Sequence, residues 1–185
     1  TLLIGAGLVF RSFQKVQGIY PGFRTAGILT YQIALPYAAY ADEAKRQAFF
    51  EQHLEKVRAL PGVTEAALVS GPPLSNSHDG RSFEVEGAPP KAPNAQDPIV
   101  LHLVATPGYF ETMGITLLAG RFFQEQDNRP DSERTVIINE SFAAHFWPGQ
   151  NAVDKRLRFQ GAQDWMRVIG VTRDVKHYGL EQPMR

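Results

Sequence analysis

Cysteine is absent from this chain of 185 residues, and so is any net charge. Without cysteine these residues can form no disulfide, iron–sulfur cluster, thiolate zinc site or cysteine nucleophile. Lys plus Arg and Asp plus Glu number 19 each, and no run of basic residues occurs. A surface without excess positive charge does not attract a phosphate backbone, so nucleic acid is not expected as a partner.

Motifs that carry chemistry are missing as well. The five histidines are scattered without metal-ligand spacing, no P-loop occurs, and no serine stands in a G-x-S-x-G frame. Gly5-Ala6-Gly7 begins like a dinucleotide fingerprint, but Phe10 stands where the third glycine belongs. The remaining candidate is His78-Asp79, an imidazole beside a carboxylate, although adjacent loop residues rarely face each other productively. We therefore expect no catalytic, cofactor-binding or metal site, and no enzyme.

The beginning of the chain is apolar. Thr1 to Phe10 carry no charge before Arg11 and Lys15. Ten helical residues cover about 15 Å, whereas a bilayer core measures about 30 Å. We expect residues 1–19 to be the outer end of a transmembrane helix with its stalk; a short buried helix or strand is the alternative. Both ends of the chain look cut, so we expect a fragment of a longer protein.

The next segment predicts a β-α-β unit. Residues 27–35 and 63–69 are rich in β-branched and aromatic side chains, which is typical of strands. Residues 42–60 between them predict a helix that packs Phe50, Leu54 and Val57 onto a sheet, with His53 at the surface.

Residues 71–94 contain five prolines and predict an irregular insert with one small edge strand over 82–86. Further strands are expected at 98–105, 117–123, 134–139, 155–159 and 165–174. Helices are expected at 106–114, with Thr106 as N-cap, and at 140–147, with Asn139 as N-cap. The fold class is therefore α+β with a mixed sheet, and the core domain spans residues 20–185.

A series of short phrases, in order along nearly the whole chain, resembles the MacB-type periplasmic core domain of FtsX-like ABC-transporter permeases, most closely the duplicated type. The phrases are Gly5 to Leu8, Arg11 to Phe13, Pro21 to Phe23, Leu29-Thr30, Leu60 to Val63, Ser70 to Leu74, Thr106 to Ile115, Leu118 to Arg121, Val136 to Glu140, Phe146 to Gly149, Lys155 to Leu157 and Val168 to Val171.

The resemblance implies two porter-like β-α-β halves with a small inserted subdomain, roughly residues 71–133. It implies a place on the periplasmic side of a bacterial inner membrane, and an ABC ATPase that acts from the cytoplasmic side. It also implies a second permease copy, either in a dimer or as an internal duplicate. The domain would couple ATP-driven motion of membrane helices to export or to a periplasmic partner, without chemistry of its own.

Two other functions stay open at this point. One is a soluble, two-lobed α/β module that binds or senses a ligand. The other is a hydrolase that uses His78-Asp79. We further expect the Pro-rich insert to matter for transport or docking but not for folding.

Overall fold

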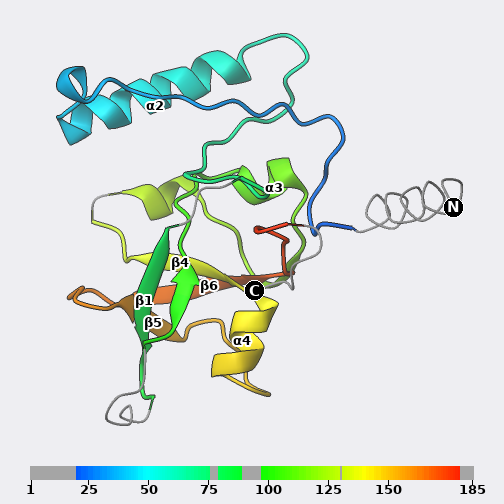
Figure 1. The fold of residues 1–185 in the computed structure, drawn as a ribbon, viewed down its shortest axis with the longest axis vertical. Coiled ribbons are helices and arrows are strands. Elements are labelled where there is room, and N and C mark those ends of the chain that lie inside the picture. Colours follow the sequence, from blue (N-terminus) through cyan, green and yellow to red (C-terminus); the bar gives the residue numbers. More distant parts are fainter. Residues whose placement is uncertain (1–19, 76–78, 89–96, 130, 180–185) are drawn as a thin grey trace, which may run out of the picture.

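The structure is a computed structural model that describes residues 20–75, 79–88, 97–129 and 131–179 (Figure 1). The expected membrane segment, residues 1–19, and His78 lie outside these residues. Among the helices that the structure describes, none is long and apolar enough to span a bilayer.

A mixed sheet of six strands forms the body of the described chain (Figure 1). Strand β6 is central, because β4 pairs with it in parallel along one edge while β5 and β3 pair antiparallel with its beginning and end on the other. Strand β1 pairs with β5 and extends the sheet, and β2 pairs with β1 as the outermost strand on that side. The expected α+β class with a mixed sheet is confirmed. The strands are β1 Gly80–Val85, β2 Ile99–Leu101, β3 Leu117–Gly120, β4 Thr135–Asn139, β5 Arg156–Phe159 and β6 Met166–Thr172.

The two longer helices begin where the sequence predicts. In α2 (Glu43–Arg58) the Asp42 carboxylate accepts a hydrogen bond from Lys45 N at 2.9 Å. In α4 (Glu140–Phe146) the Asn139 side chain accepts one from Phe142 N at 3.1 Å. Such a side-chain acceptor satisfies an N–H group that has no partner within the helix.

The short helix α3 (Tyr109–Met113) begins later than predicted. Its N-cap is Gly108, not Thr106. The Thr106 hydroxyl instead accepts a hydrogen bond from Leu68 N at 2.9 Å, so a contact distant in sequence has displaced the local cap. Two 3-10 helices, η1 (Tyr37–Ala39) and η2 (Glu125–Asn128), complete the described helices.

The strands predicted at 27–35 and 63–69 are wrong. The first segment is irregular and runs alongside α2, and the second forms only one bridge, Val69 with Ala105 (Figure 1). Strand-forming side chains do not make a ladder without a neighbouring strand in register. The first β-α-β unit therefore consists of α2 and two irregular flanking segments.

The predicted edge strand in the Pro-rich segment is an interior strand. Strand β1 lies between β2 and β5, and its Phe83 is only 1% exposed. The Phe83 ring lies 5.1 Å from both Phe142 and Phe146 of α4, measured between ring centroids. Because β1 supplies one of the most buried side chains, the expectation that this segment is dispensable for folding does not fit the structure.

Two apolar clusters hold the sheet body together. The first lies between α4 and the sheet and contains Ile138, Trp147, Leu157 and Val168. The second joins α3 to both ends of the described chain and includes Phe23, Tyr109, Met113, Ile115 and Val175.

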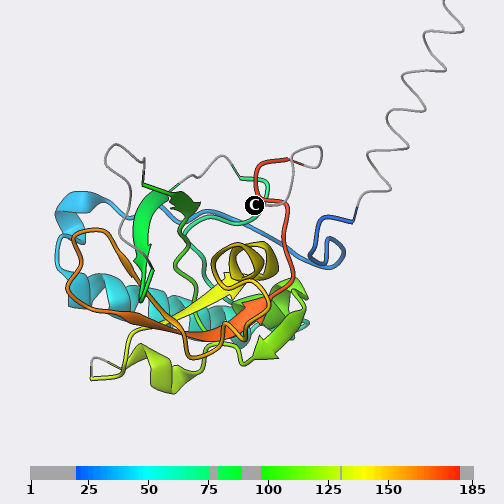
Figure 2. The ribbon, with the colours of Figure 1, turned by 90° about the horizontal axis from the view of Figure 1, so that it is seen from below.

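Helix α2 lies apart from the sheet, above α3 and the irregular segments (Figures 1 and 2). Leu54 is its one buried residue among those described, and Phe50 and Val57 are half-buried. The expectation that these side chains pack on the sheet is therefore wrong. His53 is half-buried, and its ring forms a 2.6 Å hydrogen bond with the exposed Tyr31 hydroxyl.

Candidate functional site

The described residues assemble no reaction centre. They contain no group of three His, Cys, Asp or Glu side chains placed to hold a metal. Asp79, the carboxylate of the sequence-predicted pair, lies 3.1 Å from His102 Nδ1 and 3.2 Å from Arg81 Nε. The His102 hydrogen bond, followed by Arg81, holds the pKa of Asp79 below its usual value. An exposed carboxylate already held by two partners is a surface ion pair rather than a poised base.

The two ends of the described domain meet in contacts between residues far apart along the chain. We call residues 21–24 and 174–177 the terminal clasp. Lys176 N donates to Pro21 O at 2.9 Å, and Phe23 packs with Val175. At Gly22 the backbone has φ +89°, and a Cβ there would lie 2.3 Å from the carbonyl oxygen of Asp174. Only glycine allows this close approach without displacement of the backbone.

Arg24 attaches the clasp to α3. Its backbone N–H donates to Met113 O at 2.7 Å, and its guanidinium donates to Thr112 O at 2.7 Å. The last carbonyl groups of a helix have no partner within it, and a positive charge there is favourable. The clasp thus holds the carboxyl end of α3.

Asp174 attaches the clasp to α4. Its side chain is buried and accepts hydrogen bonds from Ser141 N, at 3.1 Å, and from the Ser141 hydroxyl. In return, Asp174 N donates to the Glu140 carboxylate at 3.1 Å. This reciprocal arrangement satisfies the Ser141 N–H group at the start of α4 and fixes the segment after β6 against that helix.

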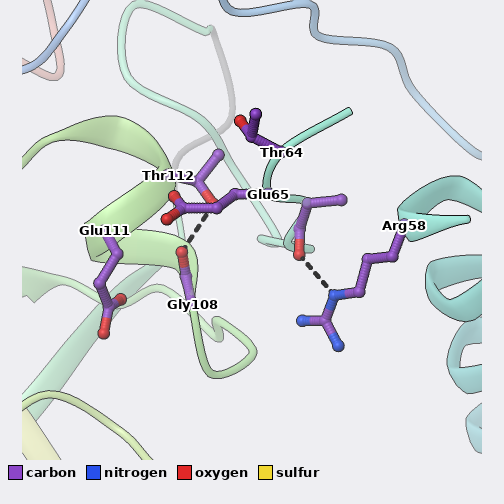
Figure 3. Close-up of a pocket in the computed structure, with 7 residues that line it drawn as sticks. Arg58, Thr64, Glu65, Gly108, Glu111 and Thr112 are labelled. Carbon is purple, nitrogen blue, oxygen red and sulfur yellow. Dashed lines mark hydrogen bonds between the residues drawn. The ribbon is translucent and has the colours of Figure 1, made fainter. Parts of the chain in front are cut away.

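An open groove separates α2 from α3 (Figure 3). On one side Arg58, at the end of α2, donates from Nε to Ala66 O at 3.1 Å. On the other side Thr112 of α3 donates to Gly108 O at 2.7 Å, and Glu111 lies beside it. No hydrogen bond between the side chains in Figure 3 crosses from α2 to α3. The two sides can therefore change their spacing without breaking such a bond. The lining residues are Arg58, Thr64, Glu65, Ala66, Gly108, Glu111 and Thr112.

A second open pocket lies directly on the clasp. It is lined by Phe23, Arg24 and Met113, with Leu74 opposite, and Leu74 N donates to the carbonyl oxygen of His177 at 3.0 Å. Burial lowers the pKa of His177 below its usual value of 6.5. The proline-rich loop at 72–75 thereby joins the same junction.

Sequence reasoning missed the clasp. In the sequence, Pro21 to Phe23 contribute only to the family resemblance, and no pattern assigns a role to Arg24 or Asp174. The side chain of Arg24 bonds to Thr112, 88 residues away, and that of Asp174 bonds to Ser141, 33 residues away. No local pattern could indicate contacts over such separations.

The described residues thus form an α+β domain whose two ends are bonded to each other and to α3 and α4. Residues 2–183 match the family of MacB-like periplasmic core domains, and the chain belongs to that family. The family resemblance noted from the sequence is confirmed. A comparison with curated proteins finds no match.

Several solved structures are similar to the described chain. The periplasmic region of MacB from Actinobacillus actinomycetemcomitans shares 16% identity over 69% of this chain and 55% of that one, with a TM-score of 0.47. The extracellular domain of the noncanonic ABC-type transporter YknZ from Gram-positive bacteria shares 17% identity over 67% and 57%, with a TM-score of 0.48. A domain of a putative permease protein from Porphyromonas gingivalis shares 23% identity over 64% and 43%, with a TM-score of 0.42. The match thus extends over little more than half of each of the first two chains.

Proposed function

We propose that this chain is the extracytoplasmic domain of an ABC-transporter permease and that it transmits ATP-driven motion of membrane helices. The observation that carries the proposal is the terminal clasp, because the segments that enter and leave the domain are bonded to each other, to α3 and to α4. A movement of the entering segment would reach two helices through direct hydrogen bonds. Membership of the MacB-like family supports the same function.

The proposal includes the setting of the domain. Residues 1–19 form the outer end of a transmembrane helix, and residues 20–185 form the core domain on the periplasmic side of a bacterial inner membrane. Residues roughly 71–133 are an insertion whose strands have joined the main sheet. An ABC ATPase acts from the cytoplasmic side, and a second permease copy, or an internal duplicate, stands beside this one. The domain performs no chemistry.

The groove between α2 and α3 is where the motion should appear. The clasp holds the carboxyl end of α3 through Arg24, while Gly108, at the start of α3, lines the groove that faces Arg58 of α2. A tilt of α3 therefore changes the spacing across the groove. Such coupling is a shift between two arrangements of packed elements.

Spin labels across the groove test the proposal without knowledge of the substrate. In the full-length permease with its ATPase, labels at Arg58→Cys and Glu111→Cys should give a distance distribution that changes when the ATPase is trapped with nucleotide. The matched control is a pair at Arg134→Cys and Asp164→Cys, two exposed surface residues whose side chains are 2.9 Å apart. Its distances should stay constant. Identical distributions in all nucleotide states for the groove pair would contradict coupling through α3.

The groove also supports a second candidate, a two-lobed module that binds a ligand between α2 and α3. The observation in its favour is the set of charged side chains on the lining, namely Arg58, Glu65 and Glu111. The same labels distinguish the two functions. A ligand-binding module would change its distances on addition of a small charged ligand to the isolated chain, whereas the proposed coupling requires the ATPase.

A further inference from the structure

One stretch of the chain is without charge and strongly exposed. Residues 25–41 contain no Asp, Glu, Lys or Arg, although 21% of the chain is charged. Within this stretch Leu29 is 88% exposed and Tyr31 is 57% exposed. Large apolar side chains that gather on an otherwise charged surface mark an interaction site.

The backbone of this stretch is also open. Among the described residues, none from 25 to 35 takes part in a backbone–backbone hydrogen bond or a strand pair. The segment nevertheless runs drawn out along α2, held by the Tyr31–His53 contact (Figure 1). Its composition, GILTYQIAL at 27–35, is typical of strands. Charged side chains and proline usually prevent an exposed extended segment from pairing with another strand, and here the first proline is Pro36. The partner that would satisfy this backbone is therefore a second strand.

The sequence of the segment fits its own antiparallel copy. When two copies are aligned about Tyr31, Leu29 of each lies opposite Ile33 of the other, and Thr30 lies opposite Gln32. Ile28 then lies opposite Ala34. These three pairs match apolar with apolar or polar with polar, which is the pattern that stabilises cross-strand neighbours. A charged partner strand would find no counter-charge in this segment.

We propose that residues 27–35 pair antiparallel with the same residues of a second copy of this chain, about a two-fold axis at Tyr31. The contact is isologous, so it closes into a dimer and does not propagate. Two nine-residue strands bury less surface than a standard interface, so the contact is weak in solution and depends on concentration. In a membrane, confinement of two permease copies would raise their effective concentration. The inference does not depend on the proposed coupling.

Single cysteines test the register, because the chain has no native cysteine. Directly opposite residues in an antiparallel pair have Cα atoms about 4.5–5.5 Å apart, within the range of a disulfide. Tyr31→Cys should therefore form a disulfide-linked dimer under mild oxidation of the 185-residue chain. Tyr37→Cys, at a more exposed position with Tyr37 at 85% and Tyr31 at 57% exposure, should nevertheless crosslink at least about tenfold more slowly.

A mixture of two variants keeps Tyr31 and checks the same register. Leu29→Cys alone and Ile33→Cys alone should crosslink slowly, whereas the two mixed together should crosslink rapidly. Urea unfolding of each variant identifies any that fails to fold. Equal crosslinking at residues 31 and 37, or no enhancement in the mixture, would overturn the proposal.

Charge pairs provide an independent readout of association by sedimentation. Thr30 and Gln32 are exposed, so substitutions there should leave the fold intact. The T30K/Q32E variant places opposite charges across both pairs and should associate about tenfold or more tightly than T30K/Q32K, which places like charges there. A parallel pairing, or pairing with residues 63–69 of the same chain, would not give this order and would refute the antiparallel dimer.

Discussion

Gly22 is the residue on which the terminal clasp depends. Its left-handed backbone and the nearby carbonyl oxygen of Asp174 leave no space for a side chain. Gly62 also has a left-handed backbone, with φ +84°, but a Cβ there would meet nothing within 4 Å. A comparison of substitutions at Gly22 and Gly62 therefore separates the stability cost of the backbone conformation from that of a steric clash.

Gly22→Ala should therefore destabilise the chain more than Gly62→Ala. A left-handed non-glycine residue costs about 1–2 kcal/mol, and forced displacement of packed backbone adds about 1–3 kcal/mol. We expect the free energy of unfolding, measured in urea, to fall by about 1–2 kcal/mol for Gly62→Ala and by about 2–5 kcal/mol for Gly22→Ala. Equal losses would mean that residues 21–24 and 174–177 are not closely packed.

His177 gives the clasp a dependence on pH. Burial lowers the pKa of its imidazole in the folded chain below 6.5, so folding favours the neutral ring. Its contribution to stability is therefore complete above about pH 6.5 and declines as the pH falls toward the lowered folded pKa, because the unfolded chain takes up the proton first.

His177→Gln should flatten this part of the pH profile. Urea midpoints measured between pH 7.5 and 5 should decline less in this variant than in the parent chain. Gln52→Asn, an exposed substitution in α2 without a titratable group, is the control and should keep the parent slope. A parent slope in the His177 variant as well would place the responsible proton elsewhere.

At the scale of elements, the sequence predicted those parts of the fold that depend on local contacts. Asn139, the predicted cap of α4, bonds to an N–H group three residues ahead, so a short pattern contains both partners. Asp42, predicted as the first residue of the long helix, caps α2 in the same way. The strands predicted at 27–35 and 63–69 depend on neighbours that a pattern cannot identify. Residues 68–70 bond to 104–106 over one short stretch, and no ladder follows. Thr106 does not cap α3, because its hydroxyl accepts a hydrogen bond from Leu68 N in the same contact.

Strand β1 shows the opposite error, because its Pro-rich surroundings concealed a core element. Replacing Gly80–Val85 by a Gly/Ser linker of equal length should abolish the cooperative unfolding transition.

Phe83→Ala alone should lower the free energy of unfolding by about 3–5 kcal/mol, because the ring fills the space beside Phe142 and Phe146. Tyr37→Ala, at an exposed position, should change stability by less than about 0.5 kcal/mol. A cooperative transition in the linker variant would restore the view that this segment is a separate insertion.

At the scale of the whole molecule, the sequence indicated the family but not the route that we propose for motion across the domain. The family could be named because many short sequence phrases that resemble it occur in order along nearly the whole chain. The route consists of contacts between residues that are far apart, from Pro21 to Lys176 and from Arg24 to α3. It connects the entering segment to the groove that faces α2.

Arg24 is the residue at which this route can be weakened without loss of the fold. Arg24→Gln removes the guanidinium from Thr112 O but keeps the backbone bond to Met113 O. Because Arg24 is exposed, the lost hydrogen bond should cost only about 0.5–1.5 kcal/mol of stability. In the full-length permease, however, the change in spacing between labels at residues 58 and 111 on nucleotide trapping should shrink or vanish. Arg134→Gln removes an exposed ion pair with Asp164 and should leave that change intact. If Arg24→Gln keeps the full change in spacing, motion reaches α2 by another path, and α3 is not its carrier.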